Sequence, residues 1–271
     1  MNESNSNFKV IEYMHNTYSH NLSDVSLIYA AQKSKQGLPY PPLDLMQYGE
    51  VKARHIASGR KDFKRIIDSI KKSGIDLNEI NKIFELGCAN CRILRHFEIF
   101  ISKNKYREAW GSDINSNTIN WAIENLSPPF NLFVNTTQPH IPMVDEYFDL
   151  IYAYSVFTHI GDLFTTWLLE LKRILNRSKY LYISIHDENS IRFGYEHPQR
   201  KIGVFTNKYR NLMDQLLDGK VDFLSVNREN VIQVYVRREY ICNRLSQWFD
   251  ILQVEEYTMG NHQTALLLKK K

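Results

Sequence analysis

"KIFELGCANCRILRHF", residues 82–97, decides the fold class. The apolar-rich residues 82–86 predict a buried strand, Gly87 opens a tight turn, and a helix is predicted over about 89–102. A strand, a glycine turn and a helix in this order are typical of the first βα unit of a parallel sheet. The turn also contains a C-x-x-C pair, Cys88 and Cys91. The stretch is therefore either a redox or metal motif, or a loop that holds a nucleotide-like cofactor.

Strands and helices alternate downstream of this stretch. The predicted strands are 82–86, 109–113, 131–135, 148–153 and 180–185, followed by 250–258 and 264–270. The predicted helices are about 89–102, 115–126, 162–175 and 238–249. Such alternation predicts a single Rossmann-like α/β domain, with a mostly parallel sheet and helices on both faces. The nearly continuous apolar runs favour strands that are buried on both sides.

Two regions fall outside this alternation. Residues 1–75 predict an N-terminal extension or lid, which ends in an amphipathic helix over 62–74 and contains the lid candidates Tyr48, Gly49, Arg54 and His55. The segment from about residue 187 to 235 is polar and contains a helical piece over 207–219. This pattern predicts an insertion that covers the site. The main domain is therefore predicted to span 76–271.

Composition excludes several classes of protein. The chain is 43% hydrophobic and 24% charged, with a net charge of +4, so nothing indicates a nucleic-acid partner. Three cysteines cannot form a disulfide framework, which favours a reducing compartment. Residues 1–10 are polar and do not resemble a secretory signal, and no apolar run has the length of a membrane span. We therefore expect a cytoplasmic protein.

Two carboxylates mark the ligand edge of the predicted sheet. In an open α/β sheet, ligands bind at the carboxyl ends of the strands. Glu85 lies near the end of the first strand, and Asp113 ends the second, where its carboxylate can accept two hydrogen bonds from a ribose diol. Gly87 permits close approach of the backbone to a ligand. Asp113 could instead cap the following helix, although Asn115 can do so equally well.

The segments "FELGCANCR", "GSDIN" and "FDLIYAYSVFTHI" together resemble the class I S-adenosylmethionine-dependent methyltransferases. The pattern around "GCxxxRxLRHF", "SVFTH" and a late "HQ" is similar to a bacterial branch that modifies sugars and surface polysaccharides, including capsules. The resemblance implies a seven-stranded sheet whose last strand is antiparallel. It also implies S-adenosylmethionine lying across the carboxyl edge, with S-adenosylhomocysteine as the product.

The resemblance, together with the strand ends, predicts a cofactor-binding set: Glu85, Gly87, Cys88, Ala89, Arg92, Asp113, Ile114, Asn135, Thr136, Ala153, Tyr154 and Ser155. The sequence departs from the family pattern E-x-G-x-G-x-G, because Ala89 and Cys91 occupy the second and third glycine positions. A nicotinamide-dependent oxidoreductase is disfavoured, because G-x-G-x-x-G is absent. A redox role of the C-x-x-C pair is disfavoured, because no short thioredoxin-like domain surrounds it and the spacing of Glu85 and Asp113 would be unexplained. A zinc site is disfavoured too, because it needs about four ligands and Cys242 is the only other cysteine.

Three histidines are candidates for the chemical step. His159, His186 and His262 follow or precede strands at the expected ligand edge. Methyl transfer to an alcohol requires a base, and histidine titrates near neutral pH. Each of them could also be a packing residue. No tight metal-binding spacing is present among them, so no metal site is predicted.

The sequence thus predicts a methyltransferase that acts on an oxygen of a carbohydrate or another small polar acceptor, which can be phosphorylated. The alternatives are transfer to nitrogen or to a phosphate-bearing small molecule, and a non-catalytic partner subunit with a decayed cofactor loop. A homodimer and a pairing with another methyltransferase subunit both stay open.

Overall fold

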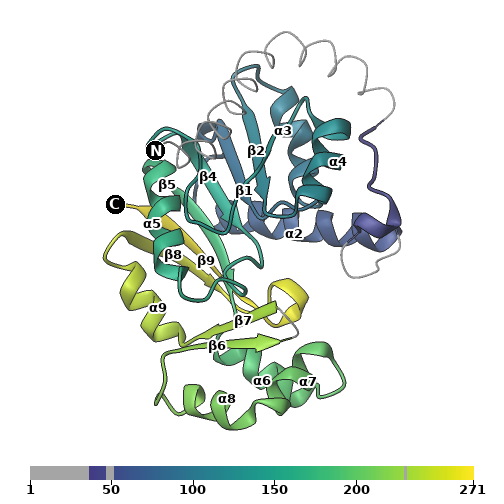
Figure 1. Cartoon of the computed structure of the whole chain (residues 1–271). Helices are drawn as coiled ribbons and strands as arrows, with labels where there is room; N and C mark the ends of the chain where they lie inside the picture. Colours follow the sequence, from purple (N-terminus) through teal and green to yellow (C-terminus); the bar gives the residue numbers. More distant parts are fainter. Residues whose placement is uncertain (1–36, 47–51, 229–230) are drawn as a thin grey trace, which may run out of the picture.

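Seven strands form one sheet in the order β3-β2-β1-β4-β5-β9-β8 (Figure 1). The computed structural model describes residues 37–46, 52–228 and 231–271. The strands are β1 (Lys82–Leu86), β2 (Glu108–Asp113), β3 (Asn131–Val134), β4 (Phe148–Ala153), β5 (Leu175–Ile185), β8 (Phe249–Glu255) and β9 (Thr264–Lys270). Strands β1 to β5 pair in parallel, and β9 is antiparallel to both of its neighbours. The predicted fold class, with an antiparallel last strand, is confirmed.

Alternate residues of the central strands enter two different cores. Phe84 and Ile151 pack on one face with helices α5 (Phe164–Ile174) and α9 (Arg238–Leu245). Ile83 and Leu150 pack on the other face with α2 (Lys52–Lys72) and α4 (Ser116–Leu126). These strands are buried on both sides, which explains why their sequences are apolar throughout rather than alternating.

The segment after β1 differs from the predicted helix over 89–102. Residues 89–93 form turns, followed by the 3₁₀ helix η4 (Leu94–Phe97) and the short helix α3 (Glu98–Ser102). Ala89 and Cys91 have φ of 48° and 60°, which a right-handed helix cannot contain. The predicted helix is therefore wrong over its first turns, and Cys91 lies in a turn.

The segment between β5 and α9 forms a separate lobe at one end of the molecule (Figure 1). It contains α6 (Glu188–Glu196), α7 (Lys201–Lys208), α8 (Arg210–Leu217) and the antiparallel hairpin β6 (Phe223–Arg228) and β7 (Val231–Val236). This hairpin was not predicted from the sequence. The lobe has a small core of its own, which includes Ile191, Phe205 and Tyr235.

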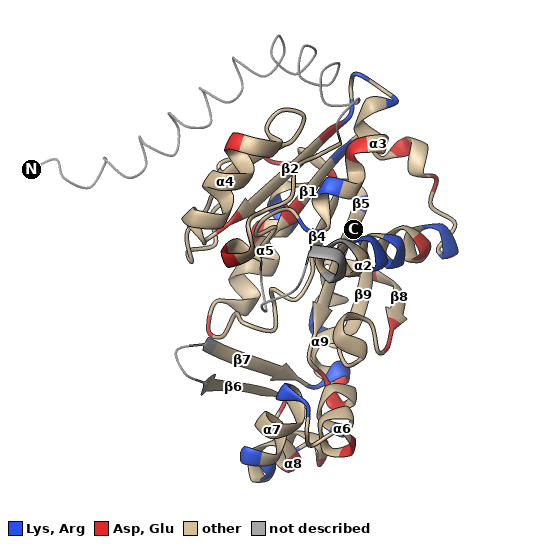
Figure 2. Cartoon of the chain, turned by 90° about the vertical axis from the view of Figure 1, so that its right-hand side faces the viewer, with Lys and Arg blue, Asp and Glu red and all other residues tan. Residues whose placement is uncertain are grey.

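The remaining described elements are short 3₁₀ turns at η1 (Leu43–Leu45), η3 (Leu77–Glu79) and η5 (Met259–Asn261). Basic and acidic residues are interspersed along the sequence of α2 (Figure 2). Within the described residues, no helix combines the length and apolar character that a membrane span requires.

Candidate active site

The turn after β1 brings the backbone of two neighbouring strands together. Gly87 has φ of 74°, and a Cβ added there would lie 2.4 Å from Cγ2 of Val156. The N–H groups of Gly87 and Cys88 both donate to the Ser112 carbonyl, at 2.8 and 2.9 Å. Only glycine combines this left-handed conformation with such close contact.

Both cysteines of the C-x-x-C pair are free and buried beneath this turn. Burial raises the pKa of the Cys88 thiol well above its ordinary value. A thiol that is buried and protonated is a poor nucleophile and a poor metal ligand. Among the described residues, no group of three or more histidine, cysteine or acidic side chains is arranged to hold a metal ion.

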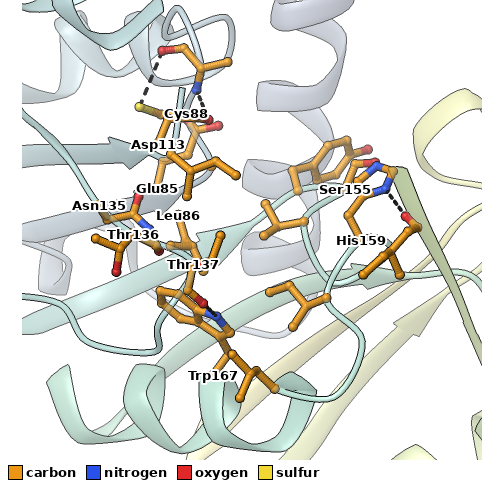
Figure 3. Close-up of a pocket in the computed structure, with 18 of the residues that line it drawn as sticks. Glu85, Leu86, Cys88, Asp113, Asn135, Thr136, Thr137, Ser155, His159 and Trp167 are labelled. Atoms are coloured by element: carbon orange, nitrogen blue, oxygen red, sulfur yellow. Dashed lines mark hydrogen bonds between the residues drawn. The ribbon is translucent and has the colours of Figure 1, made fainter. Parts of the chain in front are cut away.

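Glu85 and Asp113 both line a cavity at the carboxyl edge (Figure 3). Burial raises the pKa of Glu85 to about 8, although the hydrogen bond from the Tyr152 hydroxyl, at 2.9 Å, opposes this shift. Asp113 Oδ2 accepts the Ala89 N–H and Oδ1 accepts the Asn115 N–H, each at 2.8 Å. A carboxylate has about four lone-pair positions, so both oxygens of Asp113 can still accept hydroxyl groups.

Asn115, rather than Asp113, caps helix α4. The Asn115 side chain accepts the N–H groups of Asn117 and Thr118. The capping role that the sequence left open for Asp113 is therefore filled by its neighbour. Burial raises the pKa of the Asp113 carboxyl, and its backbone hydrogen bonds partly offset this effect.

The end of the cavity beside Asp113 suits a flat heteroaromatic ring. Ile114 is 59% exposed and lines the cavity, as do Asn135, Thr136 and Trp167. Figure 3 shows Asn135 and Thr136 between Asp113 and Trp167. Oδ1 of Asn135 is buried and has no hydrogen-bond partner among the described residues. A buried acceptor without a partner costs free energy, which an amino group on a bound ring would relieve.

The opposite end of the cavity contains a hydrogen-bonded group around Ser155. Ser155 has φ of 62°, and its N–H donates to Ser184 Oγ at 2.7 Å. Gln263 Nε2 donates to Ser155 Oγ at 2.8 Å, while Gln263 Oε1 accepts from Ser184 Oγ at 2.7 Å. The amide side chain of Gln263, the residue before β9, thus fixes the end of β5 and the turn after β4 relative to each other.

His159 lies at this second end, and its tautomer is defined by the lobe. His159 Nδ1 is 2.8 Å from the Ile232 carbonyl oxygen of the β6–β7 hairpin (Figure 3). A carbonyl can only accept, so this bond favours the tautomer with its proton on Nδ1 and a lone pair on Nε2, and the amide nitrogen of Gln233 lies farther from the same Nδ1, at 3.3 Å. His159 and Ile232 both line the cavity, and His159 is exposed.

Three of the predicted site residues do not line the cavity: Ala153, His186 and His262. Ala153 is fully buried in the core. The His186 ring is buried beside the rings of Tyr235 and His262, whose centroids lie 4.9 Å and 5.3 Å from the centroid of the His186 ring. Burial lowers the pKa of His186 well below its ordinary value, and Nδ1 of His262 bonds within its own loop, to the Gly260 carbonyl. The other predicted site residues line the cavity.

Other site residues were missed or lie outside the described chain. Asp62 on α2 accepts from Arg92 Nη1 at 2.7 Å, and Gln263 and Trp167 also escaped prediction. Only the late "HQ" pair signalled Gln263. Among the lid candidates, Tyr48 and Gly49 lie outside the described residues, as does the Arg54 side chain, and His55 is buried.

The cavity fits a cofactor that contains a nucleoside. Its volume is about 540 Å³, within the range of about 300–1,000 Å³ that is usual for ligand pockets. The Asp113 carboxylate can accept the hydroxyl groups of a diol, and the amide oxygen of Asn135 has no partner among the described residues. The apolar side chain of Ile114 and the carboxyl group of Glu85, close to the Gly87 turn, also line the cavity. These are the groups needed to bind a ribose, an adenine and a positively charged amino acid.

Comparisons with known proteins agree with this geometry. The family model described as a methyltransferase domain matches residues 84–183. A search of curated proteins found no match. Among solved structures, the PH0226 protein from Pyrococcus horikoshii OT3 is 14% identical with a TM-score of 0.51, and the match covers 83% of this chain and 99% of that one.

Two further solved structures are S-adenosylmethionine-dependent methyltransferases. The protein from Aquifex aeolicus is 14% identical, with a TM-score of 0.51 and coverage of 86% of this chain and 100% of that one. The protein from Clostridium acetobutylicum ATCC 824 is 12% identical, with a TM-score of 0.52 and coverage of 81% and 94%. At these identities the structures show the shared fold, and the matched domain gives the chemistry. The chain is a class I S-adenosylmethionine-dependent methyltransferase, and S-adenosylmethionine is its cosubstrate.

Proposed function

We propose that the protein methylates a hydroxyl oxygen of an uncharged polar acceptor such as a carbohydrate. The observation that carries the proposal is the bond from His159 Nδ1 to the Ile232 carbonyl, which leaves Nε2 free to accept a proton. Within the predicted cofactor-binding set, Asp113 would hold the ribose hydroxyls, Asn135 the adenine edge, and Glu85 the charged methionine end. His159 and Ser155 would then face the acceptor.

The base acts as the new bond forms. When bound, the cosubstrate supplies a methyl group on a positively charged sulfur and leaves as neutral S-adenosylhomocysteine. His159 Nε2 accepts the proton of the acceptor hydroxyl while the hydroxyl oxygen attacks the methyl carbon in line with the departing sulfur. Ser155, fixed by Gln263, offers its hydroxyl group to orient the acceptor.

The charge of the cavity favours an uncharged acceptor over a phosphorylated one. Of the described residues that line it, Glu85, Asp113 and Asp162 are acidic, and Arg92 is the only lysine or arginine. Arg92 is paired with Asp62 at 2.7 Å. A phosphate group in this cavity would meet the carboxylates of Asp113 and Asp162 and an arginine that is already paired with Asp62, which is electrostatically unfavourable. The resemblance to sugar-modifying enzymes supports a carbohydrate hydroxyl as the acceptor, and surface-polysaccharide biosynthesis as the process.

The proposal is tested by measuring S-adenosylhomocysteine release with neutral sugars, phosphorylated sugars and amines as acceptors. We expect turnover with a neutral sugar, and a fall of about 10²–10⁴-fold in kcat for His159→Gln. His140→Gln is the matched control, because His140 is exposed and does not line the cavity. Turnover with amines that survives His159→Gln would instead establish the N-methyltransferase alternative. Cosubstrate binding without turnover on any acceptor would favour a non-catalytic partner subunit.

A further inference from the structure

The cofactor loop is held in a conformation that its own residues disfavour. Ala89 and Cys91 have φ of 48° and 60°, although neither is glycine. A side chain with a Cβ costs free energy in this left-handed region, and such residues persist only where their surroundings fix them. The loop also has to keep its shape for function, because the Ala89 N–H donates to Asp113 Oδ2 at 2.8 Å.

Segment 38–46 makes two of the contacts that fix this loop. Asn90 is 1% exposed, and its Nδ2 donates to the Leu45 carbonyl at 2.7 Å. Arg95 is 5% exposed, and its Nη2 donates to the Leu38 and Pro39 carbonyls at 3.0 and 2.6 Å. The Arg95 guanidinium also lies 4.1 Å from the centre of the Tyr40 ring. Asn90 lies in the loop and Arg95 lies in η4 directly after it, and both side chains donate to backbone that precedes the sheet.

Helix α2 makes the third contact. Asp62, which is 5% exposed, accepts a hydrogen bond from Arg92 Nη1 at 2.7 Å. One turn earlier, Gly59 lies so close to the loop that an added Cβ would be 2.2 Å from the Arg92 carbonyl oxygen. The helix therefore touches both the side chain and the backbone of Arg92.

We propose that these contacts form a clamp that replaces the missing glycines of the cofactor loop. The N-terminal clamp consists of Leu38, Pro39, Leu45, Gly59 and Asp62. All five precede the matched methyltransferase domain, which begins at residue 84. In this proposal Asp62, Asn90 and Arg95 are positioning residues. They hold Ala89 and Cys91 in the left-handed conformation, so that the loop meets S-adenosylmethionine already shaped. The inference rests on the proposed cofactor site at this loop.

The test measures the Kd of the full-length protein for S-adenosylmethionine by calorimetry. Asn90→Ala and Asp62→Ala each remove one clamp contact, and each is expected to raise Kd about tenfold. In turnover assays the effect should fall on KM for S-adenosylmethionine rather than on kcat. Asp68→Ala is the matched control, because Asp68 is on the same helix but outside the clamp.

Rescue by glycine separates positioning from a general loss of stability. Ala89→Gly removes the methyl group that disfavours positive φ. We expect Ala89→Gly to tighten binding more strongly in the Asn90→Ala background than in the wild-type background. Equal effects of Ala89→Gly in both backgrounds, or clamp variants with wild-type Kd and KM, would overturn the clamp. Failure of the wild-type protein to bind would instead overturn the proposed cofactor site, so the two failures are distinguishable.

Discussion

Glu85 should make the stability of the ligand-free protein fall as pH rises. Its pKa is raised from 4.5 to about 8, chiefly by burial. Between these two values the unfolded chain loses a proton that the folded protein keeps, so ionisation favours unfolding. The stabilisation that protonated Glu85 gives the folded protein is therefore complete below about pH 4.5. It is lost as pH rises towards 8, because the free energy of unfolding falls by about 1.4 kcal/mol per pH unit.

Glu85→Gln isolates this effect, because glutamine has the same shape as the protonated acid and cannot ionise. Between pH 5.5 and pH 7.5, Glu85 should lower the free energy of unfolding by about 3 kcal/mol, which corresponds to roughly 5–10 °C in Tm for a chain of this size. Thermal unfolding of both proteins across this range tests the value. Wild-type Tm should fall by that much more than the Tm of Glu85→Gln.

The comparison needs a control that lacks the buried environment. Glu124→Gln removes an exposed carboxyl group on α4 and should leave the pH dependence of Tm as in the wild type. Parallel curves for wild type and Glu85→Gln would refute the reasoning, because they would mean that Glu85 ionises normally when the protein is folded. A positively charged cofactor should favour the ionised form of Glu85, so binding of S-adenosylmethionine at pH 7 should release protons.

One NMR measurement and two substitutions also test the site. ¹⁵N NMR of histidine-labelled protein should show His159 protonated at Nδ1, and a proton on Nε2 alone would contradict its assignment as the base. Gln263→Leu should free Ser155 and raise KM for the acceptor by about tenfold, with a smaller effect on Kd for S-adenosylmethionine; unchanged kinetics would mean that the network has no role in binding the acceptor. Gly87→Ala should abolish measurable S-adenosylmethionine binding in calorimetry, because its Cβ would lie 2.4 Å from Val156; wild-type affinity would show that the turn adapts.

The sheet could be predicted because its strands carry a strong local signal. Strand β1, for example, is found at the predicted residues 82–86, and β4 at 148–153. Parallel strands that are covered on both faces need apolar residues at nearly every position, which a single sequence displays clearly. The cavity edge followed from topology, because the carboxyl ends of parallel strands meet there. Asp113 and His159 were found in this way, and both line the cavity.

The parts that escaped prediction depend on contacts between distant residues. The segment after β1 has a helical sequence, but its backbone takes a different path. In that path the side chains of Asn90 and Arg95 donate hydrogen bonds to segment 38–46. Strand β6 mixes apolar and polar residues and pairs only with β7, so its own signal is weak. Strand β7 is rich in β-branched residues, and this local signal was overlooked within a segment that is polar as a whole. His186 is at the predicted edge, but it faces Tyr235 of the lobe, and no local pattern encodes that direction.

The most direct test of the account is a calorimetric titration with S-adenosylmethionine and S-adenosylhomocysteine, with Asp113→Ala measured alongside the wild-type protein. The account predicts micromolar binding by the wild type, and an increase in Kd of tenfold or more, about 1.4 kcal/mol, for the variant. Wild-type protein that binds neither compound, or an Asp113→Ala variant that binds as tightly as the wild type, would contradict the assignment of this cavity as the cofactor site.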